Sequence, residues 1–157
     1  MPAISALLID FDGVLRHWPP DDDAIERESG VPIGAIRTAA FAPARLLPAI
    51  LGRIDDDAWR ERIAADLAAR FPEADAARAV HRWSQPPGRI DEDVRAILQA
   101  ARSRLRIVLV TNATSRLPTD LAALGIGDLF HGVANSSELG AAKPDAAIFH
   151  AALPLAA

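Results

Sequence analysis

Two carboxylates separated by one residue follow a short apolar run near the N-terminus, where Asp10 and Asp12 precede Gly13. One carboxylate can attack as a nucleophile, and a second one close by can donate a proton to a leaving group and later activate water. A glycine directly after the pair permits a tight turn and a close approach of the backbone to a ligand. An ordinary turn rich in aspartate and glycine is the competing interpretation, and the pair alone does not decide between them.

A hydroxyl and a lysine at two later positions could complete such a site. Thr111 and Asn112 follow a second apolar run, and Lys143 precedes Pro144 and Asp145 farther along the chain. A hydroxyl and backbone N–H groups at a strand end can hold a phosphate oxygen, and a lysine can neutralise both the phosphate and a nearby aspartate. Taken singly, Thr111 and Asn112 could instead cap a helix, and Lys143 could be a solvated surface side chain.

Alternating strands and helices are predicted to position these residues. Apolar runs predict strands over residues 4–9, 105–110 and 130–134, the first one buried on both faces as in a parallel sheet. A helix is predicted over residues 145–152, where Pro144 suits the first helical position. The expected fold class is α/β, a doubly wound, Rossmann-like parallel sheet. Ligands of such sheets bind at the carboxyl ends of the strands, where the polar residues above lie.

A helical segment interrupts this pattern after the carboxylate pair. Residues 16–23 predict a loop, and residues 55–57 supply acids at the start of a helix. One face of that helix carries apolar residues at every fourth position: Trp59, Ile63, Leu67 and Phe71. Both Trp59 and Trp83 are expected to belong to the core of this helical segment.

The run QPPG at residues 85–88 is a clear break and marks the second boundary of the helical segment. The patterns therefore predict a discontinuous α/β core over residues 1–14 and 89–157, with an inserted helical cap over residues 15–88.

Composition narrows the possible functions and partners. The net charge of −4 gives no electrostatic reason to expect a nucleic acid or an anionic membrane as a partner. The chain has no cysteine, which excludes disulfides, thiol catalysis and cysteine-bound zinc. The N-terminus lacks a basic start followed by a long apolar stretch, so no signal peptide is expected, and the expected location is cytoplasmic.

Together these features resemble the haloacid dehalogenase (HAD) superfamily, in the branch that carries a helical cap after its first motif. The resemblance rests on the segments ALLIDFDGVL, IVLVTNAT and ELGAAKPDAAIF. It implies that Asp10 is the nucleophile that becomes phosphorylated and that Asp12 is the general acid and base. It also implies a phosphate site that includes Gly13, Thr111, Asn112 and Lys143. Magnesium would be held by the Asp10 carboxylate, the Asp12 backbone carbonyl and acids from a fourth motif.

The function implied is that of a phosphohydrolase acting on a small phosphorylated metabolite through an aspartyl-phosphate on Asp10. Asp12 favours a phosphate ester, because an alkoxide leaving group needs a proton whereas a halide needs none. A haloacid dehalogenase is therefore the less favoured hydrolase.

The fourth motif of the superfamily, an acidic pair after one more strand, has no match, because no acid follows Asp145. This predicts a chain truncated at its C-terminus, an incomplete sheet, and feeble or no turnover, since phosphoryl transfer depends heavily on bound metal. Residues 4–9 would then form an apolar sheet edge that invites self-association. A truncated or degenerate, non-catalytic relative is the alternative to an enzyme.

Overall fold

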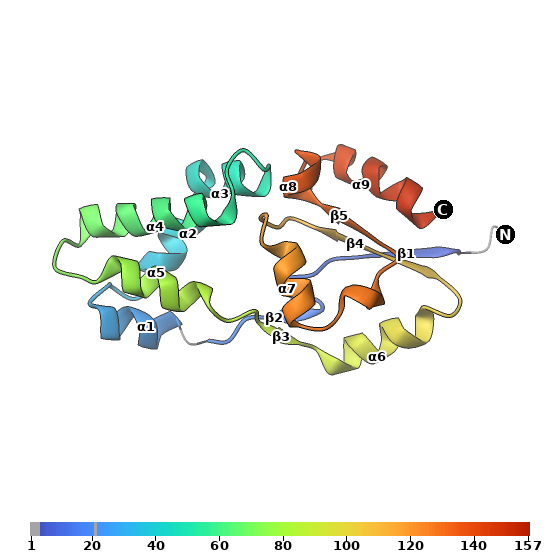
Figure 1. Cartoon of the computed structure of the whole chain (residues 1–157), viewed down its shortest axis with the longest axis horizontal. Coiled ribbons are helices and arrows are strands. Elements are labelled where there is room, and N and C mark those ends of the chain that lie inside the picture. Colours follow the sequence, from blue (N-terminus) through green and yellow to red (C-terminus); the bar gives the residue numbers. More distant parts are fainter. Residues whose placement is uncertain (1–3, 21) are drawn as a thin grey trace.

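A computed structural model of the protein describes residues 4–20 and 22–157. Residues 1–3 of the predicted core and residue 21 of the predicted loop lie outside the described residues. A sheet with helices on both faces lies at one end of the molecule, and a group of helices lies at the other (Figure 1). The strands are β1 (Ala6–Ile9), β2 (Arg16–His17), β3 (Arg89–Ile90), β4 (Arg106–Thr111) and β5 (Gly132–Asn135).

Helices occupy both the segment between β2 and β3 and the connections of the sheet. The first group is α1 (Asp22–Ser29), α2 (Ala35–Ala40), α3 (Pro43–Ile50), α4 (Asp56–Arg70) and α5 (Ala76–Ser84). The second group is α6 (Glu92–Ala101), α7 (Leu117–Ala123), α8 (Ser136–Leu139) and α9 (Ala146–Ala152), with short 3₁₀ helices η1 (Gly127–Leu129) and η2 (Leu153–Ala156).

The three long strands form a parallel sheet in the order β1-β4-β5. Side chains of β4 alternate between the two faces, as a strand requires. Ile107 and Leu109 pack with α6 and α7 on one face, while Val108 and Val110 pack with α9 on the other. The predicted α/β fold with a doubly wound parallel sheet is confirmed.

The first strand is less buried than predicted. Leu8 is 37% exposed, and the other residues of β1 are only partly buried. This exposure arises because, within the described residues, β1 pairs with β4 alone and so forms an edge of the sheet. Burial on both faces was therefore a wrong expectation, whereas the expected apolar edge is present.

Helices α1 to α5, here called the insert, pack around a hydrophobic core of their own. Asp55 caps α4 by accepting a hydrogen bond from the Ala58 N–H at 2.8 Å, as the acids before this helix predicted. Ile63 and Leu67 are completely buried, and each such side chain contributes roughly 2 kcal/mol of transfer free energy. Leu15 packs in the core of the sheet instead, and the boundaries proposed for the cap remain a prediction.

The last residues of the sequence pack against the sheet. Asp145 caps α9, accepting a hydrogen bond from the Ala147 N–H at 2.9 Å, so Pro144 precedes the helix and the expected place for this proline inside its first turn was wrong. Ile148 and Ala152 are fully buried against β4 and β5. Because many of its side chains are the small ones of alanine, α9 can pack closely against the sheet.

The two connections between the sheet and the insert run side by side and form a two-stranded antiparallel ribbon, β2–β3, which we call the hinge. A loop was expected at the first of these connections, and the pairing of two short segments far apart in sequence explains the difference. Gly88 sits in the hinge with φ +86°, and a Cβ at this position would approach the Arg16 side chain to 2.8 Å. A Cβ on Gly52, which has φ +67°, would come still closer to a neighbour, 1.9 Å from the Ser137 carbonyl oxygen of the core.

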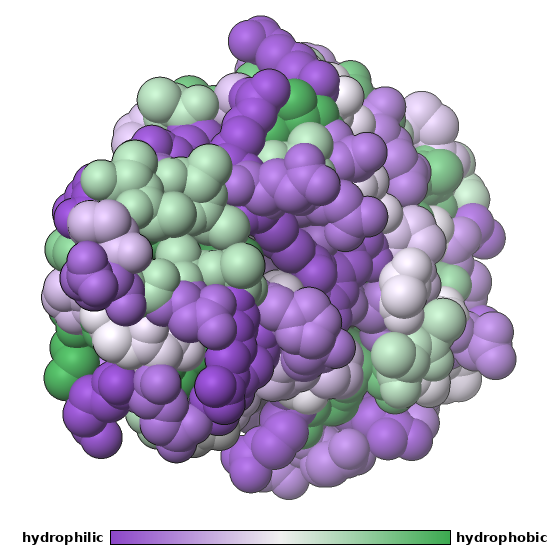
Figure 2. Space-filling view, turned by 60° about the vertical axis from the view of Figure 1, so that its left-hand side comes forward, coloured by the Kyte–Doolittle hydropathy of each residue, from purple (hydrophilic) through white to green (hydrophobic). Residues whose placement is uncertain are grey.

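Hydrophilic residues form a band down the middle of the face on which the insert comes forward, between areas richer in hydrophobic residues (Figure 2). Among helices in the described part of the chain, none combines the length and apolar character needed to cross a membrane.

Candidate functional site

The carboxyl ends of the parallel strands bring the first and last predicted residues together. Asp10 directly follows β1, and Lys143 lies in the loop between α8 and α9. The Lys143 Nζ atom is 2.6 Å from Asp10 Oδ1, which also accepts a hydrogen bond from the Phe11 N–H at 2.7 Å. Because two donors fix Oδ1, the second carboxylate oxygen is the one presented for chemistry.

Asn112 fixes the loop that carries the lysine. Its side-chain amide donates to the Lys143 carbonyl oxygen at 3.0 Å, and its Oδ1 accepts from the Lys143 N–H at 2.7 Å. The structure therefore brings Asn112 to the site as a residue that orients Lys143, and a phosphate contact by its side chain would require one of these bonds to break. Thr111 ends β4 opposite Asn135 and is almost completely buried, so a phosphate would have to approach the strand end closely to meet its hydroxyl.

Asp12 is turned toward the hinge. Its Oδ1 accepts hydrogen bonds from Arg16 Nε at 2.7 Å and from Trp18 Nε1 at 3.1 Å, and its Oδ2 accepts one from Arg16 Nη2 at 3.1 Å. Gly13 has φ +79°, which explains the glycine in this turn, and the space beside its Cα is open. In this arrangement both oxygens of Asp12 are occupied by donors from the hinge.

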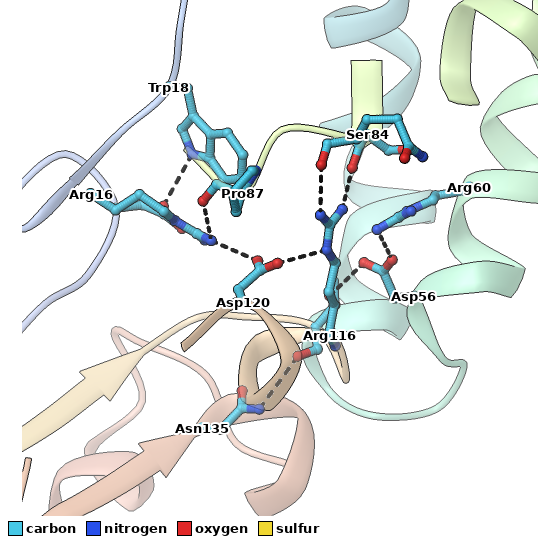
Figure 3. A network of polar contacts seen from close by, with 12 residues as sticks. Arg16, Trp18, Asp56, Arg60, Ser84, Pro87, Arg116, Asp120 and Asn135 are labelled. Atoms are coloured by element: carbon cyan, nitrogen blue, oxygen red, sulfur yellow. Dashed lines mark hydrogen bonds and ion pairs between the residues drawn. The ribbon is translucent and has the colours of Figure 1, made fainter. Parts of the chain in front are cut away.

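Arg16 continues from Asp12 into a buried ionic network (Figure 3). Its Nη1 atom is 2.6 Å from Asp120 Oδ2 on α7, and Arg116 Nε is 2.7 Å from Asp120 Oδ1. The Arg16 guanidinium also lies over the rings of Phe11 and Trp18, at 4.1 and 4.2 Å. Arg16 is 4% exposed, so its charge is stabilised by these partners instead of water.

The network also includes the segment that connects α5 of the insert to β3. Arg116 donates to the backbone carbonyl oxygens of Ser84 and Gln85, and Arg16 donates to that of Pro87 at 3.4 Å. The start of α4 adds a further link, because Asp56 accepts a hydrogen bond from Thr114 Oγ1 at 2.6 Å. Asp56 also forms an ion pair with Arg60.

Sequence reasoning missed this network. Arg116 lies four residues before Asp120 at the start of α7, and this helical spacing offered a weak local signal for that pair alone. No local sequence pattern predicts the pairing of Arg16 with Asp120, because these residues are 104 positions apart.

A cleft of about 460 Å³ lies between the strand ends and the insert, within the range of about 300 to 1,000 Å³ that is usual for small-molecule sites. Asp12, Gly13 and Asn112 line it from the core. Asp10 and Lys143 are not among its lining residues, but Asn112, which binds the Lys143 backbone, is one of them. The insert contributes apolar and aromatic side chains to the opposite wall.

The residues present are a limited but chemically suitable set for Mg²⁺. This ion prefers oxygen ligands and is usually held by one or two carboxylates together with waters and substrate phosphates. Asp10 offers a partly exposed carboxylate, and Asp12 offers a backbone carbonyl, whereas no group of three or more His, Cys, Asp or Glu side chains within residues 4–20 and 22–157 could hold a metal. The set fits Mg²⁺ when a substrate phosphate and waters complete the coordination.

One titratable pair lies in the hinge itself. His17 Nε2 is 3.3 Å from Asp91 Oδ2. The Val94 N–H, which the Asp91 side chain caps, holds the pKa of this carboxyl below its usual value, and the hydrogen bond with His17 lowers it further.

A carboxylate in contact with a lysine lies at the strand ends of a doubly wound parallel sheet, the place where α/β proteins of this kind bind their ligands. The family of haloacid dehalogenase-like hydrolases matches residues 4–154, and the chain belongs to this family. No curated protein matches the sequence.

Solved structures share the fold. A HAD family enzyme from Bacteroides thetaiotaomicron gives a TM-score of 0.73 at 18% identity, covering 98% of this chain and 78% of that one. The wild-type form of that enzyme in complex with magnesium and inorganic phosphate gives 0.71 at 20% identity, covering 97% and 78%. L-2-haloacid dehalogenase from Xanthobacter autotrophicus with chloropropionic acid covalently bound gives 0.62 at 21% identity, covering 98% and 65%.

Proposed function

We propose that the protein hydrolyses phosphate monoesters of small metabolites through an aspartyl-phosphate on Asp10. The observation that carries this proposal is the 2.6 Å contact between Lys143 Nζ and Asp10 Oδ1 at the strand ends, with a second acid two residues after the first. A carboxylate held by an ammonium group can receive a phosphoryl group whose negative charge the same ammonium neutralises.

In the first step the free oxygen of Asp10 attacks phosphorus. The bond between phosphorus and the ester oxygen breaks, and its electron pair goes to the alcohol oxygen, which takes a proton from Asp12. Lys143 and the Thr111 hydroxyl stabilise charge on the phosphoryl oxygens, and Asn112 keeps Lys143 in place. When bound, Mg²⁺ would supply additional positive charge to the phosphoryl group from the Asp10 carboxylate and the Asp12 carbonyl.

In the second step a water molecule attacks phosphorus and gives its proton to Asp12. The bond between phosphorus and Asp10 breaks, and inorganic phosphate leaves. General acid–base transfer needs a distance of about 2.6 to 3.2 Å, and both Asp12 oxygens are held by hinge donors. We therefore expect Asp12 to rotate away from Arg16 and Trp18 during turnover.

The neighbour crystallised with magnesium and inorganic phosphate supports this choice of ion and ligand, as does membership in the HAD-like family. The presence of Asp12 favours a phosphate ester over a carbon–halogen bond, because only the alkoxide leaving group needs a proton.

The test is magnesium-dependent release of phosphate from an aryl phosphate by the chain, by Asp10→Asn and by Asp93→Asn as a matched control on the exposed surface of α6. We expect weak turnover in the first and the third, as the lack of a match to the fourth motif predicts, and a loss of that turnover in Asp10→Asn, because removal of a nucleophile leaves only binding and electrostatic effects. Turnover that survives in Asp10→Asn would refute the nucleophile, provided that circular dichroism shows both variants folded.

A HAD-like protein without turnover is the second candidate. The engagement of both Asp12 oxygens favours it, together with the small number of metal ligands among the described residues. If both the chain and the Asp93→Asn variant are folded and neither releases phosphate, this second candidate is the one supported.

A further inference from the structure

Aromatic side chains are concentrated in the cleft. All three tryptophans of the sequence, Trp18, Trp59 and Trp83, line it, as does Phe41. Trp59 and Trp83 pack in or against the core of the insert, as predicted, with ring centroids 5.9 Å apart, and Phe41 meets Trp83 edge to face at 6.5 Å. Two of the four stay available to a ligand, because Trp18 is 47% exposed and Phe41 is 48% exposed.

These two exposed rings come from different segments of the chain. Trp18 belongs to the connection after β2, and Phe41 follows α2 in the insert. Before any rotation of Asp12, Trp18 is held by the hydrogen bond from its Nε1 to Asp12 and by the Arg16 guanidinium over its ring. Phe41 packs edge to face against Trp83. A planar group that enters the cleft would thus meet rigid aromatic surfaces and lose little side-chain entropy on contact.

The charges of the cleft cancel. Four aspartates and four arginines line it: Asp12, Asp22, Asp56, Asp120, Arg16, Arg37, Arg60 and Arg116. Each aspartate forms an ion pair with at least one of these arginines. The lining therefore has no surplus charge with which to select a leaving group that is itself ionised, such as one with a second phosphate or a carboxylate.

Several hydrogen-bonding groups of the cleft are engaged as well, whereas Arg60 Nε is without a partner among the described residues. Arg116 is bound to Asp120 and to backbone carbonyls, and the Thr114 hydroxyl donates to Asp56. A leaving group with many hydroxyls would give up hydrogen bonds to water and find its partners already satisfied, which is unfavourable.

From these observations we propose that the cleft binds the leaving group of the substrate, and that this group is an uncharged aromatic alcohol. The substrate class is then an arylalkyl or aryl monophosphate, with its phosphate at Asp10 and its ring against the exposed aromatic side chains of the cleft. This inference rests on the proposed phosphohydrolase function for the placement of the phosphate, but the aromatic site can be tested without turnover.

The probe is 2-naphthylmethanol, the alcohol alone, titrated into the full chain by calorimetry and compared with glycerol. Saturable binding is expected, at least about tenfold tighter than that of glycerol, because the ring buries apolar surface and glycerol does not. Phe41→Ala should weaken it roughly three- to tenfold, the usual range for loss of an aromatic contact. The matched control is Phe149→Ala, since Phe149 is also exposed but lies on α9 outside the cleft.

The inference is supported if 2-naphthylmethanol binds and Phe41→Ala binds it more weakly than Phe149→Ala, whether or not the protein releases phosphate. If such binding is found without Asp10-dependent turnover, only the proposed function is refuted. An absence of saturable binding, equal effects of the two variants, or glycerol binding as tight as the aromatic alcohol would overturn the inference even if phosphate is released. Phe41→Leu, which keeps apolar volume without the ring, replaces Phe41→Ala if that variant does not fold, and the same weakening is expected.

Discussion

Removal of Asp120 tests whether the buried ionic network holds the sheet and the hinge together. The Asp120 side chain is 7% exposed and accepts short contacts from two guanidinium groups, those of Arg16 and Arg116. Asp120→Ala would leave both cations in a buried environment with one partner fewer. Breaking a buried pair in this way costs about 3 to 5 kcal/mol. We expect the lower end, about 3 kcal/mol, because Arg16 keeps Asp12 and Arg116 keeps two backbone carbonyls.

The assay is urea unfolding followed by circular dichroism. With a slope of about 1 to 3 kcal/mol per molar urea, a loss of 3 kcal/mol lowers the midpoint by roughly 1 to 3 M. Asp23→Ala is the matched control, because Asp23 and its partner Arg27 are both largely exposed, at 3.8 Å. Exposed pairs of this kind contribute about 0 to 1 kcal/mol.

Equal shifts of the midpoint in Asp120→Ala and Asp23→Ala would refute the stabilising role of the network. A double variant adds a second criterion. Arg16→Met combined with Asp120→Leu removes both charges and restores apolar volume, so its destabilisation should be smaller than the sum of the two single effects. Simple additivity would show that the two side chains do not interact in solution.

Three further outcomes are expected. Gly52→Ala should lower the unfolding free energy by more than Gly140→Ala, because both glycines have φ near +68° but only the first one faces a carbonyl oxygen that a Cβ would overlap; equal losses in urea unfolding would contradict this close approach. If β1 associates with a second copy through its open edge, Leu8→Lys should shift sedimentation toward the monomer, and an unchanged profile at all concentrations would argue against that interface. The lowered pKa of Asp91 means that its charge stabilises the fold above the ordinary carboxyl pKa, and that this stabilisation disappears as the pH falls through the lowered value. The unfolding free energies of Asp91→Asn and the parent should therefore differ near neutral pH and converge in acid, and a constant difference would exclude the charge as its cause.

Much of the sheet could be predicted from sequence because its signals are local. The buried strand β4 is an almost continuous apolar run, and the polar residues after each strand mark the carboxyl ends. Parallel strands carry these ends to one edge, so the meeting of Asp10 and Lys143 follows from topology without knowledge of any side-chain contact.

The orientation of Asp12 could not be predicted in this way. It depends on Arg16, whose own position depends on Asp120 in a distant helix and on stacking against Phe11 and Trp18. The burial of Asp56 could not be predicted from the sequence either. Its place among three consecutive acids predicted only a helix start, whereas it is buried because the start of α4 lies against the loop after β4.

The same network links the chemistry to the position of the insert. Asp12 is held by Arg16, Arg16 by Asp120, and Asp120 by Arg116, which is bound in turn to the carbonyls at the end of α5. A shift of this second connection relative to α7 must lengthen or break at least one of these contacts, because each one is already at hydrogen-bond distance. The residue proposed to protonate the leaving group is therefore linked, through Arg16, Asp120 and Arg116, to the segment that connects the insert to the sheet.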